Sequence, residues 1–190
     1  MIYNEAGFAQ PVEKHNVSIV NDPGSGSGAL DCKKQTWLKT NTSTGGQTNF
    51  TLAAWVNPRS YSGDCVIIGG CYLCVTSKGY LTTYCYGKSP AGYHSGSKTQ
   101  IPIGQWTHIA VTWSDTQCIG YVNGEEELKV ACTGTASTGG NHDKKDVGSE
   151  NSIGGRGFDG YIDDVRVYNT HLSAEDIYDL AHTKGYTTDY

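Results

Sequence analysis

The sequence is poor in charge, in long apolar runs and in phenylalanine. Only 17% of the 190 residues are charged, whereas roughly 25% is usual for a soluble domain, and there are only 3 Phe and 1 Met. This composition argues against a coiled coil, a helical bundle or a disordered tail, because each of these needs more charge or more Leu, Ala and Lys. No apolar run reaches the roughly 18 residues of a membrane-spanning helix.

Dense basic clusters are missing as well. The net charge is −5, and no window is more basic than the pairs Lys33-Lys34 and Lys144-Lys145. We therefore expect no nucleic-acid partner, which would need a basic face, and no polybasic contact with a membrane surface. The lack of a long apolar run predicts that there is no membrane insertion. Residues 1–5 contain no apolar stretch, so we expect no signal peptide: either the protein is used without export, or a leader has been removed.

What the sequence does contain is glycine and tyrosine, with 25 Gly and 13 Tyr. Short strand patterns ended by Gly, Asn or Pro recur along the chain. We predict strands at 17–20, 35–38, 50–56, 65–68, 72–76, 80–86, 106–113, 118–122, 126–131 and 161–168.

Local signals place one hairpin and one helix. Asn123-Gly124 predicts a tight hairpin, Ser173 is a good N-cap for a closing helix, and Asn57-Pro58 is expected to stop the strand before it. The sequence thus predicts an all-β fold, a two-sheet antiparallel β-sandwich of the jelly-roll type with one short C-terminal helix.

Domain organisation follows from composition. We interpret residues 1–28 as an N-terminal arm or lead-in strand, with a turn or linker at 21–28, and residues 29–190 as one jelly-roll domain. Residues 133–152 are polar and rich in Gly, Thr and Ser. They are predicted to form a long loop that is either functional or mobile.

The seven cysteines leave three interpretations open. Their number is odd, so at least one thiol is free or pairs between chains. Most can be small buried hydrophobic residues, or one or more disulfides can form, with Cys118 and Cys132 beside a hairpin as the favoured pair. A metal site is the third, although Cys71 and Cys74 form an isolated CxxC without a second half-site.

Four motifs then occur in one order along residues 28–182. They are Phe50 to Pro58, Gln105 to Trp113 with Tyr121 to Gly124, Ile153 to Gly155 with Phe158 to Asn169, and Leu172 to Ile177. In these motifs the chain resembles the laminin-G-like, concanavalin A-like jelly-roll domains. The chain departs from their usual Phe-Asp-Gly by reading Leu30-Asp31-Cys32.

The resemblance implies a fold and a candidate calcium site. In such domains the first and last strands lie side by side, which implies that Asp31 lies near Asp163 or Asp164. Some relatives bind calcium along a sheet edge with such residues, and carboxylate oxygens are suitable ligands. The alternative is that Asp163 only caps backbone N–H groups.

Structural roles are the first interpretation of several conspicuous residues. Trp55, Trp106 and Trp113 are large enough to fill the space between two sheets, and His108 is expected to be a hydrogen-bonded structural residue.

Catalysis is not expected. Glycosidases on this fold need two carboxylates across a cleft, and their Glu-x-Asp-x-x-Glu pattern does not occur here. The Glu125 to Glu127 run is expected to be a solvated hairpin tip. Asp163 and Asp164 are adjacent in a strand and so are expected to point to opposite faces.

Glycan binding needs exposed aromatic rings beside polar groups, because sugar C–H faces stack on rings while hydroxyls bind polar side chains. Alternation places Tyr80, Thr82, Tyr84 and Tyr86 on one face, and the alternative is that this row simply packs across the sandwich. The candidate glycan-binding residues are Trp37, Tyr61, Tyr72, Tyr80, Tyr84, Tyr86 and Tyr93.

The first functional hypothesis is a non-catalytic, lectin-like attachment protein of a virion surface, of the capsid-decoration or tail-fibre type, made in the host cytoplasm. Its expected partners are neighbouring structural subunits, in a homo-oligomer or a virion shell, and cell-surface glycans. Residues 1–28 would then add a strand to a neighbour. The alternative is a secreted or cell-surface carbohydrate-binding or adhesion domain with disulfides and calcium. A glycoside hydrolase or lyase would need the paired carboxylates that are missing.

Overall fold

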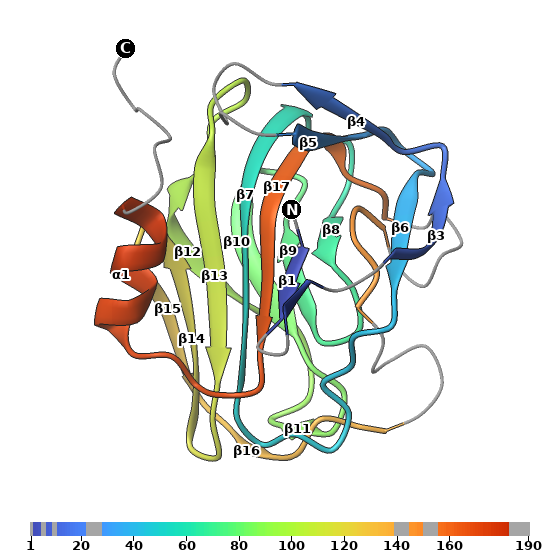
Figure 1. The fold of residues 1–190 in the computed structure, drawn as a ribbon. Helices are drawn as coiled ribbons and strands as arrows, with labels where there is room; N and C mark the ends of the chain where they lie inside the picture. Colours follow the sequence, from blue (N-terminus) through green and yellow to red (C-terminus); the bar gives the residue numbers. More distant parts are fainter. Residues whose placement is uncertain are drawn as a thin grey trace.

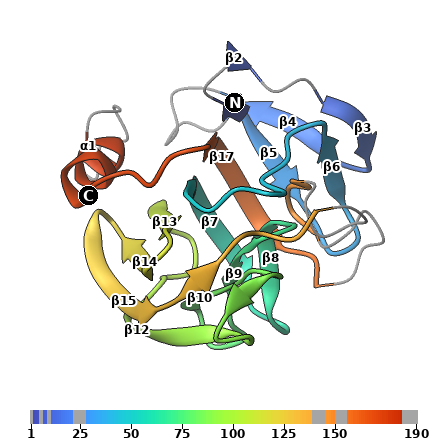
Figure 2. The same ribbon diagram turned by 90° about the horizontal axis from the view of Figure 1, so that it is seen from below.

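The described part of the chain folds into two stacked β-sheets with one helix on the outside (Figures 1 and 2). The computed structural model describes residues 2–4, 7–8, 11–21, 28–138, 145–149 and 156–182. Most of the predicted turn at 21–28 and the motif at 153–155 lie outside the described residues. None of the helical segments in this described part is long and apolar enough to cross a membrane.

The large sheet runs through the middle of the molecule. Its central strand β7 (Phe50–Ser60) pairs antiparallel with β13 and β17, and β17 also pairs with β1 and β5. The other strands of this sheet are β15 (Glu125–Ala131), β14 (Gln117–Val122), β13 (Thr107–Trp113), β17 (Asp159–Tyr168), β1 (Ile2–Asn4), β2 (Gly7–Phe8), β5 (Gly28–Cys32) and β4 (Ser18–Asn21).

The small sheet covers one face of the large one (Figure 2). Its order is β12 (His94–Gln100), β10 (Tyr80–Tyr84), β9 (Tyr72–Val75) and β8 (Cys65–Ile68). Two short ribbons complete the strands: β11 (Lys88–Ser89) with β16 (Thr133–Gly134), and β3 (Pro11–His15) with β6 (Trp37–Thr40).

The core lies between these two sheets and is built by alternate residues of each strand. Phe50 and Leu52 enter it from β7, Trp113 from β13, and Leu73 and Leu81 from the small sheet, all fully buried. Period-two alternation explains this pattern, because successive side chains of a strand point to opposite faces. The predicted antiparallel β-sandwich is confirmed.

Of the three tryptophans predicted to fill the space between the two sheets, one belongs to the core there. Trp113 lies in the core, with its ring centre 6.1 Å from that of Phe50. Trp55 is also buried, but it alternates with the core residues of β7 and meets His108 edge-on at 5.5 Å on the opposite side of the sheet. The prediction for Trp55 was therefore wrong about the face. Trp106 is half-buried.

Strand β7 continues through Asn57-Pro58, where the sequence predicted a stop. Pro58 lies opposite Gly160, and the register of β17 shifts between Asp159 and Gly160. A bulge explains the difference, since a proline without an N–H group is tolerated in a sheet where the ladder is interrupted.

A second bulge corrects the expectation for Asp163 and Asp164. Asp164 has a φ of 47°, and the register with β7 shifts between Asp163 and Arg166. The core residues on either side are Ile162 and Val165, three positions apart. Simple alternation therefore fails here, and both aspartates are buried.

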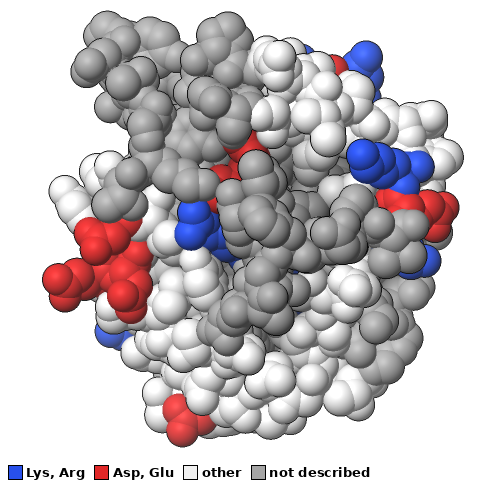
Figure 3. Space-filling view, viewed as in Figure 1, with Lys and Arg blue, Asp and Glu red and all other residues white. Residues whose placement is uncertain are grey.

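The closing helix α1 (Ala174–His182) begins as predicted. The backbone N–H of Asp176 donates to Ser173 Oγ, and Asp176 accepts from the Ser173 N–H in return, which makes a reciprocal N-cap. Ile177 packs this helix on the outer face of the large sheet. Acidic side chains gather over the helix (Figure 3).

Part of the predicted 133–152 loop is buried structure. Residues 145–149 are buried, and Val147 bridges Leu38 of β6 to Ile68 of β8. This described segment therefore extends the small sheet toward β6. These residues form no strand of their own, as predicted, but the sequence did not predict their burial, which follows because two strands remote in sequence satisfy their backbone.

The cysteine pairing also differs from the favoured one. Cys71 and Cys85 form a disulfide, and the other five cysteines are buried thiols. Cys118 lies opposite Val130 in the β14–β15 ladder, whereas the N–H of Cys132 bonds to Thr116. Cys132 thus lies two residues beyond the position opposite Cys118, which explains why no disulfide joins the two across the hairpin.

The described parts of the predicted N-terminal arm pair with strands of the same chain. Strand β1 runs parallel to β17, and β4 runs antiparallel to β5. These segments are therefore part of the chain's own sheets.

Candidate functional site

Four tyrosine rings form a cluster on the outer side of the small sheet. Leucines of β9 and β10 point into the core, so alternation turns Tyr72 and Tyr84 away from it. The ring centres of Tyr72 and Tyr84 are 6.1 Å apart, Tyr86 meets Tyr84 edge-on at 4.5 Å, and Tyr93 lies 5.2 Å from Tyr84. The predicted tyrosines 72, 84, 86 and 93 are thus brought together.

The cluster has a buried floor and an exposed rim. Tyr72 is fully buried and packs with Val66 and Cys74 in a small group separate from the core between the sheets. Tyr84 and Tyr86 are half-buried, and Tyr93 is 45% exposed. Aromatic surface of this kind is accessible from solvent while its base is rigidly packed.

Arg156 lies over this cluster. Its guanidinium carbon is 5.1 Å from the centre of the Tyr72 ring and 5.4 Å from that of Tyr93, and its Nη1 donates to the Tyr93 hydroxyl. Its own carbonyl accepts the Val66 N–H, which fixes the backbone to the edge of β8. We call the four tyrosines together with Arg156 the tyrosine face.

A hollow of about 370 Å³ adjoins the tyrosine face. Arg156 and Gly157 border it on one side, and Lys34 and Asp64 contribute charged side chains to its wall. Asp64 is oriented by accepting the N–H of Ser77. Two cationic groups and one carboxylate therefore line a hollow beside exposed aromatic rings.

This arrangement suits a ligand with both apolar and hydroxyl-bearing faces. A sugar ring presents C–H groups to an aromatic ring and hydroxyls to charged or amide groups at its edge. Guanidinium groups add planar, directed donors. Sequence reasoning missed Arg156 and Asp64, and no local pattern around either residue marks it as part of a site.

Three other predicted aromatic residues lie elsewhere. Tyr61 packs against the main core and donates its hydroxyl to the Ile101 carbonyl, and burial raises its pKa. Trp37 stacks on His15 in the β3–β6 ribbon, with ring centres 3.9 Å apart. Tyr80 lies on β10 four residues from Tyr84, beside a second hollow.

The structure does not bring the predicted calcium ligands into one free cluster. Asp31 lies opposite Tyr161 in the ladder, and its carboxylate binds Arg59, while the carboxylate of Asp164 binds Arg166. Asp163 accepts the N–H of Asp164. Among the described residues no group of three or more His, Cys, Asp or Glu side chains is arranged to hold a metal ion. These carboxylates do not fit a calcium site at this place.

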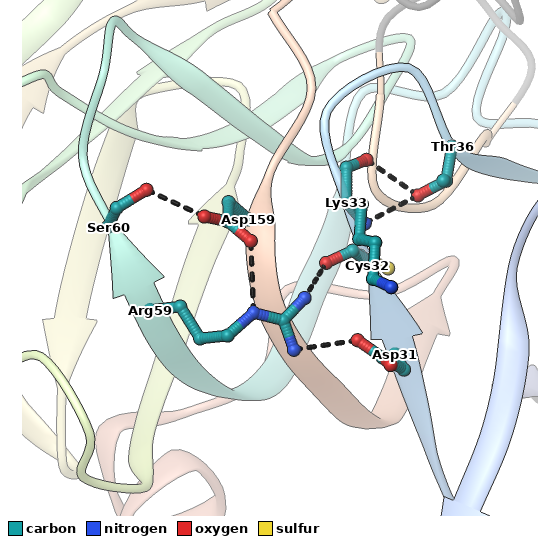
Figure 4. Close-up of polar contacts among 7 residues, drawn as sticks. All are labelled: Asp31, Cys32, Lys33, Thr36, Arg59, Ser60 and Asp159. Carbon is teal, nitrogen blue, oxygen red and sulfur yellow. Dashed lines mark hydrogen bonds and ion pairs between the residues drawn. The ribbon is translucent and has the colours of Figure 1, made fainter.

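Arg59 lies at the centre of a polar network at the end of β7 (Figure 4). Its Nε donates to Asp159 at 3.0 Å, its Nη1 to Asp31 at 2.7 Å, and its Nη2 to the Cys32 carbonyl at 2.5 Å. Its guanidinium also lies 4.8 Å from the centre of the Tyr161 ring. This polar network joins β5, β7 and β17 and has a structural role.

The same polar network sets the pKa of Asp159 and so decides whether this residue suits acid catalysis. Burial would raise the pKa of Asp159, but hydrogen bonds from Ser60 and Arg59 outweigh it and hold that pKa below its usual range. The general acid of a glycosidase needs a raised pKa, so the lowered pKa of Asp159 argues against that role for it.

Glu127 is not the solvated hairpin-tip residue that the sequence suggested. Its carboxylate accepts the N–H groups of Lys98 and Thr99 and the hydroxyl of Thr99. It therefore clamps the edge of the small sheet to β15, a contact that no local sequence pattern announces.

Comparison with known proteins agrees with this architecture. A family model described as the concanavalin A-like lectin/glucanase superfamily, of the laminin G 3 type, matches residues 33–178. No curated protein sequence matches the chain significantly.

Several solved structures share the fold. Domain 4 of AbnA, a GH43 extracellular arabinanase from Geobacillus stearothermophilus in complex with arabinotriose, is 21% identical over 90% of this chain and 83% of that one, with a TM-score of 0.70. A SAP-like pentraxin from Limulus polyphemus is 18% identical over 78% and 76%, with a TM-score of 0.57.

The binding domain of Paraclostridial Mosquitocidal Protein 1 is 15% identical over 92% of this chain, with a TM-score of 0.65, and this chain spans 47% of it. Likeness at such identities shows the fold alone.

Proposed function

This chain belongs to the concanavalin A-like lectin/glucanase superfamily, and on that premise we propose that it is a non-catalytic carbohydrate-binding module whose tyrosine face contacts the sugar. The observation that carries the proposal is the position of Arg156 between the rings of Tyr72 and Tyr93, beside a hollow with further charged groups. The arabinanase domain solved with arabinotriose lends support by fold.

Each part of the tyrosine face has a role in this proposal. Tyr93 and Tyr84 offer ring surface for the C–H face of a sugar, because aromatic rings bury large areas with little loss of conformational freedom. Arg156 donates to the hydroxyl groups or to a carboxylate of the sugar, and Tyr72 holds the guanidinium in place by a cation–π contact.

The test is a glycan-array screen followed by isothermal titration calorimetry with the best oligosaccharide. Tyr93→Ala and Arg156→Gln are expected to weaken binding at least tenfold, and Arg156→Lys to rescue it only in part because Lys lacks the planar donors. Tyr178→Ala is the matched control, because Tyr178 is 47% exposed on α1 and Tyr93 is 45% exposed.

Two results would contradict the proposal. One is an array without any bound glycan. The other is Tyr84→Ala lowering the melting temperature while leaving glycan affinity intact, which would make the tyrosine row a packing feature only.

We propose further that the module holds its ligand without cleaving it. Asp31 and Asp159 are both committed to Arg59, and the pKa of Asp159 is lowered, so neither carboxylate is set to protonate a leaving group. Release of new reducing ends from a bound oligosaccharide, abolished by substituting one acidic residue, would overturn this.

We propose that the protein works outside the cell, in attachment. A disulfide between Cys71 and Cys85 favours a secreted or cell-surface adhesion domain, since disulfides persist in oxidising compartments. A virion-surface component with neighbouring subunits as partners is the alternative, and the five cysteine thiols are compatible with assembly in a host cytoplasm. Mass measurement by light scattering and thiol counting on protein from its native source distinguish the two.

A further inference from the structure

A second hollow, of about 320 Å³, opens at the other end of strand β10. Tyr80, Ser95 and Ser97 border it, together with Lys78 of the hairpin between β9 and β10. Tyr80 is half-buried and lies on the same outer side of the small sheet as Tyr84, because the two are separated by an even number of residues. The hollow thus continues the tyrosine face along one strand.

Ser97 provides an independent sign of a ligand. Its side chain is 7% exposed, and Ser97 Oγ has no hydrogen-bond partner in the described part of the chain. Buried hydroxyl groups are nearly always hydrogen-bonded, so an unpartnered one at the wall of a hollow calls for a polar occupant. A polar group of a bound ligand that reaches Ser97 Oγ would satisfy it.

The neighbouring hydroxyls are oriented as well. Thr82 Oγ1 donates its one proton to the His94 carbonyl at 3.1 Å, and it lies 2.6 Å from Ser95 Oγ. Ser95 must then be the donor of that short contact. Ser95 Oγ therefore offers lone pairs to a hydroxyl donor, and Ser95 lies on β12 opposite Thr82, the residue midway between Tyr80 and Tyr84 on β10.

The hairpin that carries Lys78 is held in a single shape. Thr76 Oγ1 accepts the N–H groups of Lys78 and Tyr80, and Gly79 pairs with Thr76 and Ile101 through its backbone. A pre-formed wall reduces the entropy lost when a ligand binds.

Tyr80 and Tyr84 are four residues apart on one strand, which corresponds to roughly 13 Å. A single sugar ring is about as wide as one tyrosine ring and cannot contact both. We infer that the ligand is an extended oligosaccharide, bound along β10, with one sugar at Tyr84, Tyr93 and Arg156 and another at Tyr80, Ser97 and Lys78. This inference rests on the proposed function and deepens it.

The test measures how affinity depends on chain length. Isothermal titration calorimetry with arabino-, xylo-, cello- and galacturono-oligosaccharides compares the disaccharide and the hexasaccharide of each series. We expect the hexasaccharide of the series that binds to bind at least tenfold more tightly than its disaccharide. Ser97→Ala and Tyr80→Ala should remove most of that gain and leave disaccharide affinity within twofold.

Two controls separate binding from folding. Ser97→Ala removes an unpartnered buried hydroxyl, so its melting temperature should be unchanged or higher. Thr44→Val removes another buried hydroxyl without a partner among the described residues, outside both hollows, and should leave the length dependence intact.

The outcomes distinguish this inference from the proposed function. Equal affinity for disaccharide and hexasaccharide, or a length gain that survives Ser97→Ala and Tyr80→Ala, overturns the second subsite while the carbohydrate-binding role stands. No binding of any series, together with an empty glycan array, overturns both. Loss of all binding on Arg156→Gln with the length gain lost on Ser97→Ala supports both.

Discussion

Arg59 Nη1 lies 2.7 Å from Asp31 Oδ1, and this ion pair ties β7 to β5 at the end of the sandwich (Figure 4). The same guanidinium also binds Asp159 and the Cys32 carbonyl. Removing it would leave partly buried carboxylates without their partner, which costs more than the loss of an exposed pair.

We therefore expect Arg59→Met to lower the free energy of unfolding by about 2 kcal/mol or more, measured by urea denaturation. Lys39 is the control, because its pair with Glu13 is 4.0 Å long and exposed. Lys39→Met should cost less than about 1 kcal/mol. Equal losses of unfolding free energy for the two variants would contradict a structural role of the polar network at Arg59.

His108 predicts an acid-sensitive stability. Burial lowers the pKa of His108 to about 4; Asp164 raises it in part, while Arg166 and His182 lower it further. An unfolded histidine titrates near 6.5, so between pH 6.5 and 4 the unfolded state binds more protons than the folded state. Stability from this group is complete above pH 6.5 and is lost as the pH falls toward 4.

The expected slope is about 1.4 kcal/mol per pH unit at its steepest. Urea midpoints measured from pH 7 to pH 4 should fall more steeply for the natural chain than for His108→Gln, which cannot titrate. Asp159 and Glu127 also have lowered pKa values, but their contribution is lost at lower pH and is common to both proteins. Parallel curves would show that His108 does not titrate on unfolding.

The disulfide predicts a definite thiol count. Cys71 and Cys85 are joined and the other five cysteines carry thiols, so denatured protein should titrate five thiols without reductant and seven after reduction. Cys71→Ser should release the thiol of Cys85, so the denatured variant should titrate six thiols without reductant. Seven thiols in unreduced protein would contradict the pairing and favour a reducing compartment.

Gly79 should tolerate no side chain. Its φ is 80°, and an added Cβ would lie 2.9 Å from Tyr61 Cε2 and 3.3 Å from the Ile101 carbonyl oxygen. Gly104 has a similar φ of 77° with nothing within 4 Å, so Gly104→Ala measures the backbone cost alone, about 1–2 kcal/mol. Gly79→Ala should cost clearly more by thermal melting, and an equal cost would remove the packing argument.

The family resemblance implied a calcium site at Asp31, Asp163 and Asp164, whereas the contacts of these carboxylates lead to the opposite expectation. Because Asp31 binds Arg59 and Asp164 binds Arg166, we expect CaCl₂ added to chelator-treated protein to leave the melting temperature unchanged. A calcium-dependent rise that Asp163→Asn abolishes would contradict this and restore the site.

Local sequence signals were sufficient for most of the strands. The Asn123-Gly124 turn, with φ of 51° and 86°, and the Ser173 cap both act through groups a few residues apart, so a short window contains all of their chemistry. Alternation failed at Asp164 and the predicted strand end failed at Pro58, because bulges depend on how the partner strand is registered.

The sequence by itself determined an all-β sandwich, its hairpins, its closing helix and a tyrosine row on one side of β10, since each follows from the period of side chains along a strand or helix. Only the tertiary structure decided that Arg156 lies over Tyr72 and Tyr93, that Cys71 pairs with Cys85 and that Arg59 takes up Asp31. These contacts join residues from separate strands, and their geometry is fixed by the stacking of the two sheets rather than by any local pattern.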